Sequence, residues 1–180
     1  MGSGLAVAHN GNIYFSDPLN QKIWFLNARN AKKMVDEGIA FPNGLQLTPD
    51  QSLLQVSDTK GQFVYSFQVE ADGSLADKQR YFYLHLVDGS MQSGAEGMAV
   101  DTEGRLYVTT EMGIQVCDQA GRVQAIISKP QRDRVAAIAF GGANRDELYV
   151  ACDGKLYKRK INAKGVFSFE APIKPPAPHL

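Results

Sequence analysis

The chain has 180 residues, of which 44% are hydrophobic and 21% are charged, the composition of an ordinary globular protein. Its 19 basic and 19 acidic residues cancel without any basic run, so nucleic acid and anionic membranes are excluded as expected partners. No apolar stretch approaches the ~18 residues that span a bilayer. The start lacks the basic and long apolar regions of a signal peptide. A chain beginning at Met1 is therefore expected in the cytoplasm, and its location stays open if sequence precedes Met1.

Four copies of one pattern divide the chain into predicted blades. Each copy is an apolar run, a polar turn and a second run of strand-forming residues, at residues 4–15, 43–56, 96–108 and 137–150. The copies open at residues 4, 44, 97 and 138, in steps of 40, 53 and 41 residues. Repeats of ~40–45 residues built from short strands are typical of propeller blades. We predict one partial propeller domain over residues 1–170, with blades over 4–41, 42–94, 95–134 and 135–170.

Two further strands are expected to complete each blade. Period-two alternation predicts them at 22–26 and 33–35, 63–69 and 79–83, 113–117 and 123–127, and 155–159 and 167–169. Turn pairs such as Asn10-Gly11 and Asp72-Gly73 separate the strands. No stretch has helical periodicity, so the predicted fold class is all-β. The Pro-rich residues 171–180 are expected to form an extended tail that lies on or leaves the last blade.

The residue before the opening of each repeat is the candidate functional position. These residues are Ser3, Asn43, Glu96 and Ala137. If the opening strands converge on an axis, the four side chains ring one end of a channel. A carboxylate and an amide oxygen there suit a hard cation such as Ca²⁺ or Mg²⁺, or Zn²⁺ with added water. Such a cation could polarise a carbonyl group of a bound molecule, with Glu96 as the general base.

Other catalytic arrangements find little support in the sequence. The three histidines have no metal-ligand spacing, and no Ser or Cys lies in a nucleophile-elbow context. Cys117 and Cys152 fall at apolar strand positions and are predicted to be buried thiols. The second repeat is longer than the others by residues 87–94, which are expected to form a surface insertion or part of a binding mouth.

Several segments resemble the gluconolactonase family, which includes regucalcin. They are Pro-Asn-Gly-Leu at 42–45 with Thr-Pro-Asp at 48–50, Val-Ser-Asp-Thr at 56–59, Gly-Met-Ala-Val-Asp at 97–101, and Ala-Phe-Gly-Gly at 139–142. The resemblance implies a six-bladed propeller, about four blades of which lie in this chain, with one divalent cation in its central channel. It implies that Asn43 is a metal ligand and that Glu96 replaces a ligand Asp that activates the attacking water. The family's first-blade Glu ligand has no counterpart here.

Asp58 has two interpretations. It ends the second strand of its repeat, as Asp17 does, where an Asp caps a turn or ties two blades together. The segment 56–59 stands near the channel mouth in the family, so the resemblance also implies that Asp58 contacts substrate. Ser3 is a second candidate for a substrate contact.

The resemblance implies a metal-dependent hydrolase that opens sugar lactones, with Ca²⁺ as the first candidate cation and Mg²⁺ or Zn²⁺ as alternatives. Its expected partner is a small-molecule sugar lactone. Two alternatives stay open, a non-catalytic binding or scaffold propeller with an eroded metal site, and an inactive fragment of a longer enzyme. Four blades of a six-fold ring expose apolar blade faces and a strand edge, which predicts about two further blades or self-association.

Overall fold

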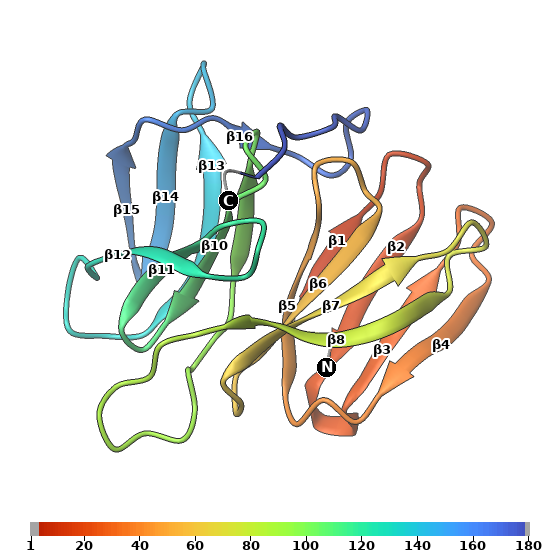
Figure 1. The fold of residues 1–180 in the computed structure, drawn as a ribbon, viewed down its shortest axis with the longest axis horizontal. Helices are drawn as coiled ribbons and strands as arrows, with labels where there is room; N and C mark the ends of the chain where they lie inside the picture. The colour runs from red at the N-terminus through yellow and green to blue at the C-terminus, as the bar shows by residue number, and fades with distance from the viewer. Residues whose placement is uncertain (1–3, 179–180) are drawn as a thin grey trace.

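A computed structural model describes residues 4–178 and consists of four antiparallel sheets arranged as propeller blades (Figure 1). Blade 1 contains β1 (Leu5–Val7), β2 (Ile13–Asp17), β3 (Lys22–Leu26) and β4 (Lys32–Glu37). Blade 2 contains β5 (Pro42–Leu47), β6 (Leu53–Asp58), β7 (Phe63–Val69) and β8 (Leu75–Tyr83). Blade 3 contains β9 (Met98–Asp101), β10 (Leu106–Thr110), β11 (Gly113–Cys117) and β12 (Val123–Ile127). Blade 4 contains β13 (Val135–Gly141), β14 (Glu147–Cys152) and β15 (Lys155–Lys160).

The architecture confirms the predicted all-β propeller class. The predicted strands 22–26, 63–69, 113–117 and 123–127 coincide with β3, β7, β11 and β12. Helical structure among the described residues is limited to one 3₁₀ turn, η1 (Pro18–Asn20). No helix in residues 4–178 has the length and hydrophobicity needed to cross a membrane.

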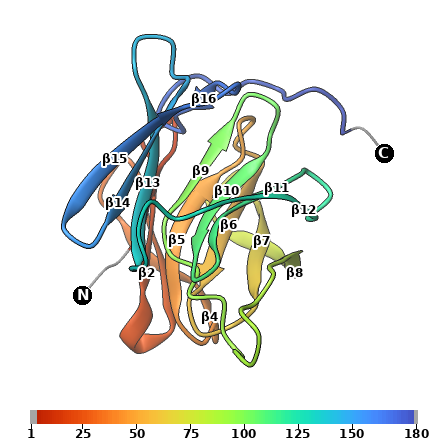
Figure 2. The same ribbon diagram turned by 90° about the vertical axis from the view of Figure 1, so that its left-hand side faces the viewer.

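The first strand of each blade lies at the inner edge of the propeller. Strand β5 contacts β1 on one side and β9 on the other. Strand β9 also contacts β13 (Figure 2). Blades 1 and 4 therefore form the two ends of a row, and β4 and β15 lie on opposite sides of the molecule (Figure 1). The four inner strands begin at one end of the propeller and finish at the other. We call the end at which the inner strands begin the site end, and the end at which they finish the strap end.

Apolar side chains form three buried clusters, one between each pair of consecutive blades. Phe67 of blade 2 packs with residues of blade 1 in the first cluster, and Cys117 lies in the second. In the third, the rings of Tyr107 and Phe140 meet edge to face with their centroids 5.1 Å apart. Burial of each large side chain stabilises the fold by about 1.5–3 kcal/mol. Both cysteines are buried thiols, as predicted.

The outer face of blade 1 lacks the cover that its equivalents have. The strand pairing aligns Leu5 with Leu45, Met98 and Ile138, since each pairs with the same position of the second strand. The last three are 6–9% exposed, because each packs against the preceding blade. Leu5 is 63% exposed. The outer face of blade 1 is therefore exposed, whereas the equivalent faces of blades 2, 3 and 4 are buried.

The C-terminal segment departs from the predicted course. The predicted fourth strand of blade 4, residues 167–169, is wrong, because these residues form no strand. Instead β16 (Gly165–Val166) pairs with β9 of blade 3. Lys164 has already left blade 4 at this point, since its carbonyl accepts a hydrogen bond from the N–H of Thr102 (2.8 Å). Blade 4 thus keeps three strands in its sheet.

Residues 165–178, which we call the strap, cross the strap end of the propeller. Ser168 donates to the carbonyl of Val7 in blade 1 (2.7 Å), and the N–H of Ile173 donates to the carbonyl of Pro49 in blade 2 (2.9 Å). Farther along, the Pro176 carbonyl accepts from Gln119 in blade 3 (2.8 Å). The tail therefore leaves the last blade, which is one of the two predicted courses, and groups of three other blades hold it. Figure 1 shows this dark blue segment running over the tops of the other blades.

Candidate functional site

The strand register corrects the alignment of the fourth repeat by one residue. Ile138 pairs with Val150 as Leu45 pairs with Val56 and Met98 with Val108. Ala137 is therefore equivalent to the opening glycine of the other repeats, and Ala136 is equivalent to Asn43 and Glu96. The ring predicted at Ser3, Asn43, Glu96 and Ala137 thus has Ala136 as its fourth member. Ser3 lies outside the described residues.

The opening glycines let neighbouring blades meet at the site end. A Cβ atom on Gly44 would lie 2.0 Å from the carbonyl oxygen of Glu96, and one on Gly4 would lie 2.1 Å from that of Asn43. Only a residue without a side chain allows such an approach between backbones. The same contacts bring Asn43 and Glu96 to adjacent positions, as the predicted convergence of the inner strands requires.

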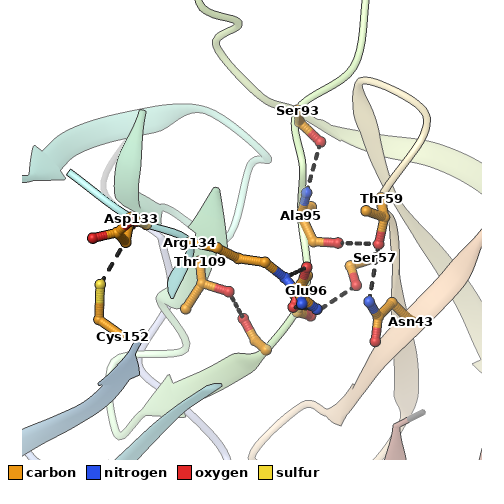
Figure 3. A network of polar contacts seen from close by, with 11 residues as sticks. Asn43, Ser57, Thr59, Ser93, Ala95, Glu96, Thr109, Asp133, Arg134 and Cys152 are labelled. Carbon is orange, nitrogen blue, oxygen red and sulfur yellow. Dashed lines mark hydrogen bonds and ion pairs between the residues drawn. The ribbon is translucent and has the colours of Figure 1, made fainter. Parts of the chain in front are cut away.

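Two hydroxyl side chains at the end of β6 connect the segments that carry these residues (Figure 3). Ser57 donates to the carbonyl of Glu96 (2.9 Å) and accepts from the N–H of Gly44 (2.8 Å). Thr59 donates to the carbonyl of Ala95 (2.7 Å) and accepts from the amide of Asn43 (3.0 Å). Asn43 and Glu96 are buried, with 8% and 6% exposure. The network thus holds the side chain of Asn43 and the backbone of Glu96, on neighbouring blades, at one end of the propeller.

The carboxylate of Glu96 forms a bidentate ion pair with Arg134. Arg134 Nη2 lies 2.6 Å from Oε2, and Nε donates to Oε1. This hydrogen bonding raises the pKa of the Arg134 guanidinium, with a further contribution from the negative charge of Glu96. Two parallel hydrogen bonds between a guanidinium and a carboxylate are among the strong polar contacts in proteins. Sequence reasoning identified Glu96 and missed Arg134, which belongs to no repeated motif.

The segment that carries Arg134 is fixed to blade 4. Residues 128–134 connect β12 to β13, and the thiol of Cys152 donates to the carbonyl of Asp133 (3.6 Å; Figure 3). Gln131 donates to the carbonyl of Cys152 (3.3 Å) and accepts from the hydroxyl of Tyr157 (2.8 Å). Blade 4 therefore contributes to the site through the connection before its first strand, while its own inner-strand residue, Ala136, adds no polar group.

A pocket of about 330 Å³ lies beside the Glu96–Arg134 pair. The cationic side chains on its wall are Lys129, Arg132 and Arg134, and the acidic ones are Glu96, Glu111 and Asp133. The surplus segment predicted at 87–94 contributes Gln92 and Gly94 to the same wall. One end of the insertion therefore lies at this pocket, and a role of the insertion in a binding mouth stays a prediction.

Asp58 lies at the end of β6, where its carboxylate is bound by backbone groups. Oδ1 accepts from the N–H of Phe41 (2.9 Å) and from that of Lys60 (3.2 Å), and the residue is 3% exposed. This geometry corresponds to the turn-capping interpretation. Contact between Asp58 and substrate stays a prediction.

The donor chemistry at the site fits a hard divalent cation in kind. Glu96 and Asn43 carry carboxylate and amide oxygens, the groups that Ca²⁺ and Mg²⁺ prefer. The described residues contain no group of three His, Cys, Asp or Glu side chains able to hold a metal. A cation would therefore take few ligands from this chain and would compete with Arg134 for the carboxylate of Glu96.

Comparison with known proteins agrees with the propeller architecture. A family profile described as "SMP-30/Gluconolactonase/LRE-like region" matches residues 5–153. The lactonohydrolase oryL of Aspergillus oryzae is 24% identical over an alignment of 202 positions, gaps included. The alignment covers 91% of this chain and 45% of that protein. The chain spans about half the length of the curated relatives it matches, such as rabbit (Oryctolagus cuniculus) regucalcin, of which it covers 51%.

Two solved structures show the same fold at low sequence identity. The calcium-binding protein regucalcin of Agrobacterium tumefaciens strain C58 superimposes with a TM-score of 0.78 at 17% identity, covering 92% of this chain and 63% of that one. A gluconolactonase of Xanthomonas campestris gives a TM-score of 0.74 at 22% identity, covering 92% and 57%. At these identities the two structures establish the fold alone.

Proposed function

Since the chain belongs to the SMP-30/gluconolactonase/LRE-like family, we propose that it contributes the active site of a hydrolase that opens sugar lactones with the help of one divalent cation. The observation that carries the proposal is the meeting of Asn43, on β5, and Glu96, two residues before β9, at the site end. The family description and the lactonohydrolase relative support the reaction class.

Glu96 is proposed as the general base of this reaction. Water attacks the lactone carbonyl carbon and its proton passes to the carboxylate of Glu96. The protonated Glu96 then gives this proton to the ring oxygen as the bond between that oxygen and the carbonyl carbon breaks. The hydrogen bond from Ser57 to the backbone of Glu96 fixes the origin of the side chain, which limits the positions that the carboxylate reaches. General-base catalysis of this kind contributes about 10²–10⁴-fold to the rate.

Asn43 and Glu96 are proposed to hold the cation, with Ca²⁺ as the first candidate and Mg²⁺ or Zn²⁺ as alternatives. When bound, the cation would supply Lewis-acid polarisation of the lactone carbonyl. The hydrogen bond between the Asn43 amide nitrogen and Thr59 fixes the plane of the Asn43 side chain and hence the direction of its oxygen. Thr59 and Glu96 also line the pocket of about 330 Å³, which we propose as the place for the sugar ring.

Hydrolysis of a sugar δ-lactone by the purified chain tests this proposal. The rate would be followed by acid release, with EDTA and with each of the three cations, for the parent chain and for Glu96→Gln and Asn43→Ala. We expect cation-dependent turnover that falls at least about 100-fold in Glu96→Gln. Glu103→Gln is the matched control, since this exposed carboxylate lies away from the site end, next to the turn after β9.

The outcomes separate the proposal from its alternatives. Turnover that survives EDTA would contradict the cation requirement while leaving the lactonase proposal standing. Equal rates for Glu96→Gln and Glu103→Gln would remove Glu96 from the mechanism. A folded chain without turnover would favour a scaffold role, or a fragment that needs the rest of a longer protein.

A further inference from the structure

The partner of Glu96 is a side chain of the protein itself, brought from another blade. Glu96 precedes β9 of blade 3, whereas Arg134 precedes β13 of blade 4. The guanidinium engages both carboxylate oxygens. The site therefore already holds a cation where the proposed function, on which this inference rests, requires one.

A divalent cation and Arg134 compete for the same atoms. Each Glu96 oxygen accepts a hydrogen bond from the guanidinium, so a metal bound there would lie within a few ångströms of a fixed positive charge. Like charges at that separation repel, and burial of the carboxylate reduces the screening by water. The ion pair therefore opposes the binding of a cation at Glu96.

Of the two partners, Arg134 is the one able to withdraw. Its side chain is 71% exposed, whereas that of Glu96 is 8% exposed. The backbone of Glu96 is bound on both sides, since its carbonyl accepts from Ser57 and its N–H donates to Thr109. Rotation of the long arginine side chain into water releases the carboxylate without moving a strand.

We propose that Arg134 is a latch that closes the cation site, so that a divalent cation binds Glu96 only by displacing the guanidinium. The latch lowers the affinity of the chain for the cation and couples cation binding to movement of the Arg134 side chain. The segment 128–134 stays in place during this exchange, because Gln131 and the Asp133 carbonyl hold it on blade 4.

Calorimetric titration with Ca²⁺ tests the latch without any measurement of activity. The parent chain would be compared with Arg134→Gln and with Arg132→Gln, which removes one positive charge from the wall of the same pocket. We expect Arg134→Gln to bind Ca²⁺ on the order of 10-fold more tightly than the parent chain, and Arg132→Gln to stay within about twofold of it. Ca²⁺ should also raise the Tm of Arg134→Gln more than that of the parent chain.

Removing Arg134 leaves a buried carboxylate unpaired, which can destabilise the fold. Arg134→Lys keeps the charge but loses the bidentate geometry, so it should fold and bind Ca²⁺ with intermediate affinity. Equal affinities of the parent chain, Arg134→Gln and Arg134→Lys would overturn the latch while leaving the cation proposal intact. Absence of Ca²⁺ binding in all three chains would overturn the latch and the cation requirement together, and the hydrolysis assay would still judge the lactonase proposal separately.

Discussion

The two ends of the propeller are built from different kinds of contact. At the site end, Asn43 and Glu96 occupy equivalent positions of neighbouring blades, and the hydroxyls of Ser57 and Thr59 connect the segments that carry them. At the strap end, residues 165–178 cross the inner strands and are held largely through backbone carbonyls. The site end thus depends on particular side chains, whereas the strap end depends on the course of the chain.

This difference assigns separate tasks to the two ends. Substitution of a site-end side chain should change ligand binding more than stability, since the clusters between the blades stay intact. Loss of the strap should lower the free energy of unfolding more than it changes ligand binding. The strap follows blade 4 in the chain and bonds to blades 1, 2 and 3, so it connects blade 4 to blades 1 and 2, which are not its neighbours in the sequence.

The largest effect is expected from removal of the strap. A chain that ends at Lys164 loses four hydrogen bonds between the strap and Val7, Pro49 and Gln51. At a net ~1 kcal/mol each, these four bonds alone account for a fall of about 4 kcal/mol in the free energy of unfolding, and the lost pairing of β16 with β9 and the lost Arg145–Glu170 ion pair add to it. Urea denaturation measures the loss, and a chain that ends at Ile173, which keeps all four bonds, is the control. Equal stability of the two shortened chains would show that the strap does not hold the blades together.

A smaller effect is expected from Gly44→Ala, which tests the limit of the separation at the site end. The added Cβ would lie 2.0 Å from the carbonyl oxygen of Glu96, so the inner strands of blades 2 and 3 must move apart. We expect a loss of about 1–3 kcal/mol in urea denaturation, typical of overpacking. Gly89→Ala is the control, because no atom lies within 4 Å of its Cβ position and only its positive φ of 79° adds strain. A loss no greater than that of the control would mean that the blades tolerate separation at this point.

The contrast between the ends also explains what the sequence could predict. Period-two alternation and turn glycines are local signals, and they locate strands such as β3 and β7 correctly. The equivalent places of Asn43 and Glu96 in their repeats likewise predict that the two residues lie at one end of the propeller. An alignment of the repeats from the sequence alone shifts the fourth repeat by one residue. The cause is the pair of alanines at 136 and 137, where the other repeats have a polar residue followed by a glycine. Only the pairing of Ile138 with Val150 resolves this register.

Contacts that no repeat encodes could not be predicted. Phe167 and Phe169 alternate as a strand would, yet Gly165–Val166 pairs with β9, because backbone groups accept partners regardless of side chain. Arg134 lies 38 residues from Glu96 in a polar connection, where an arginine is ordinarily solvated. Its role follows from the fold of blade 4 and not from any local pattern.

The outer face of blade 1 gives a third prediction, which extends the comparison to contacts outside the chain. We propose that this face mediates self-association, since Leu5 is 63% exposed where its equivalents are buried, and Phe15 stacks on Trp24 beside it. Leu5→Lys should weaken self-association about tenfold or more, because burial of one leucine contributes about 1.5–3 kcal/mol. Sedimentation equilibrium measures this, with Leu19→Lys as control, since Leu19 is 77% exposed in η1. A parent chain that stays monomeric at all concentrations would refute the proposal.

The smallest effect is expected at Cys117, whose thiol should not react while the chain is folded. Any reaction of this thiol therefore reports a loss of structure around it. Burial raises the pKa of the Cys117 thiol to about 12, with a further contribution from the charge of Asp118. Because the thiolate is the reactive form, the folded chain at pH 8 should not be alkylated by iodoacetamide at Cys117, whereas the urea-unfolded chain should be. Cys117 lies in the cluster between blades 2 and 3, so its alkylation, followed by peptide mass spectrometry, reports separation of those blades. If the strap holds the blades together, the chain that ends at Lys164 should be alkylated faster than the chain that ends at Ile173. Equal rates would place the effect of the strap elsewhere than at this interface.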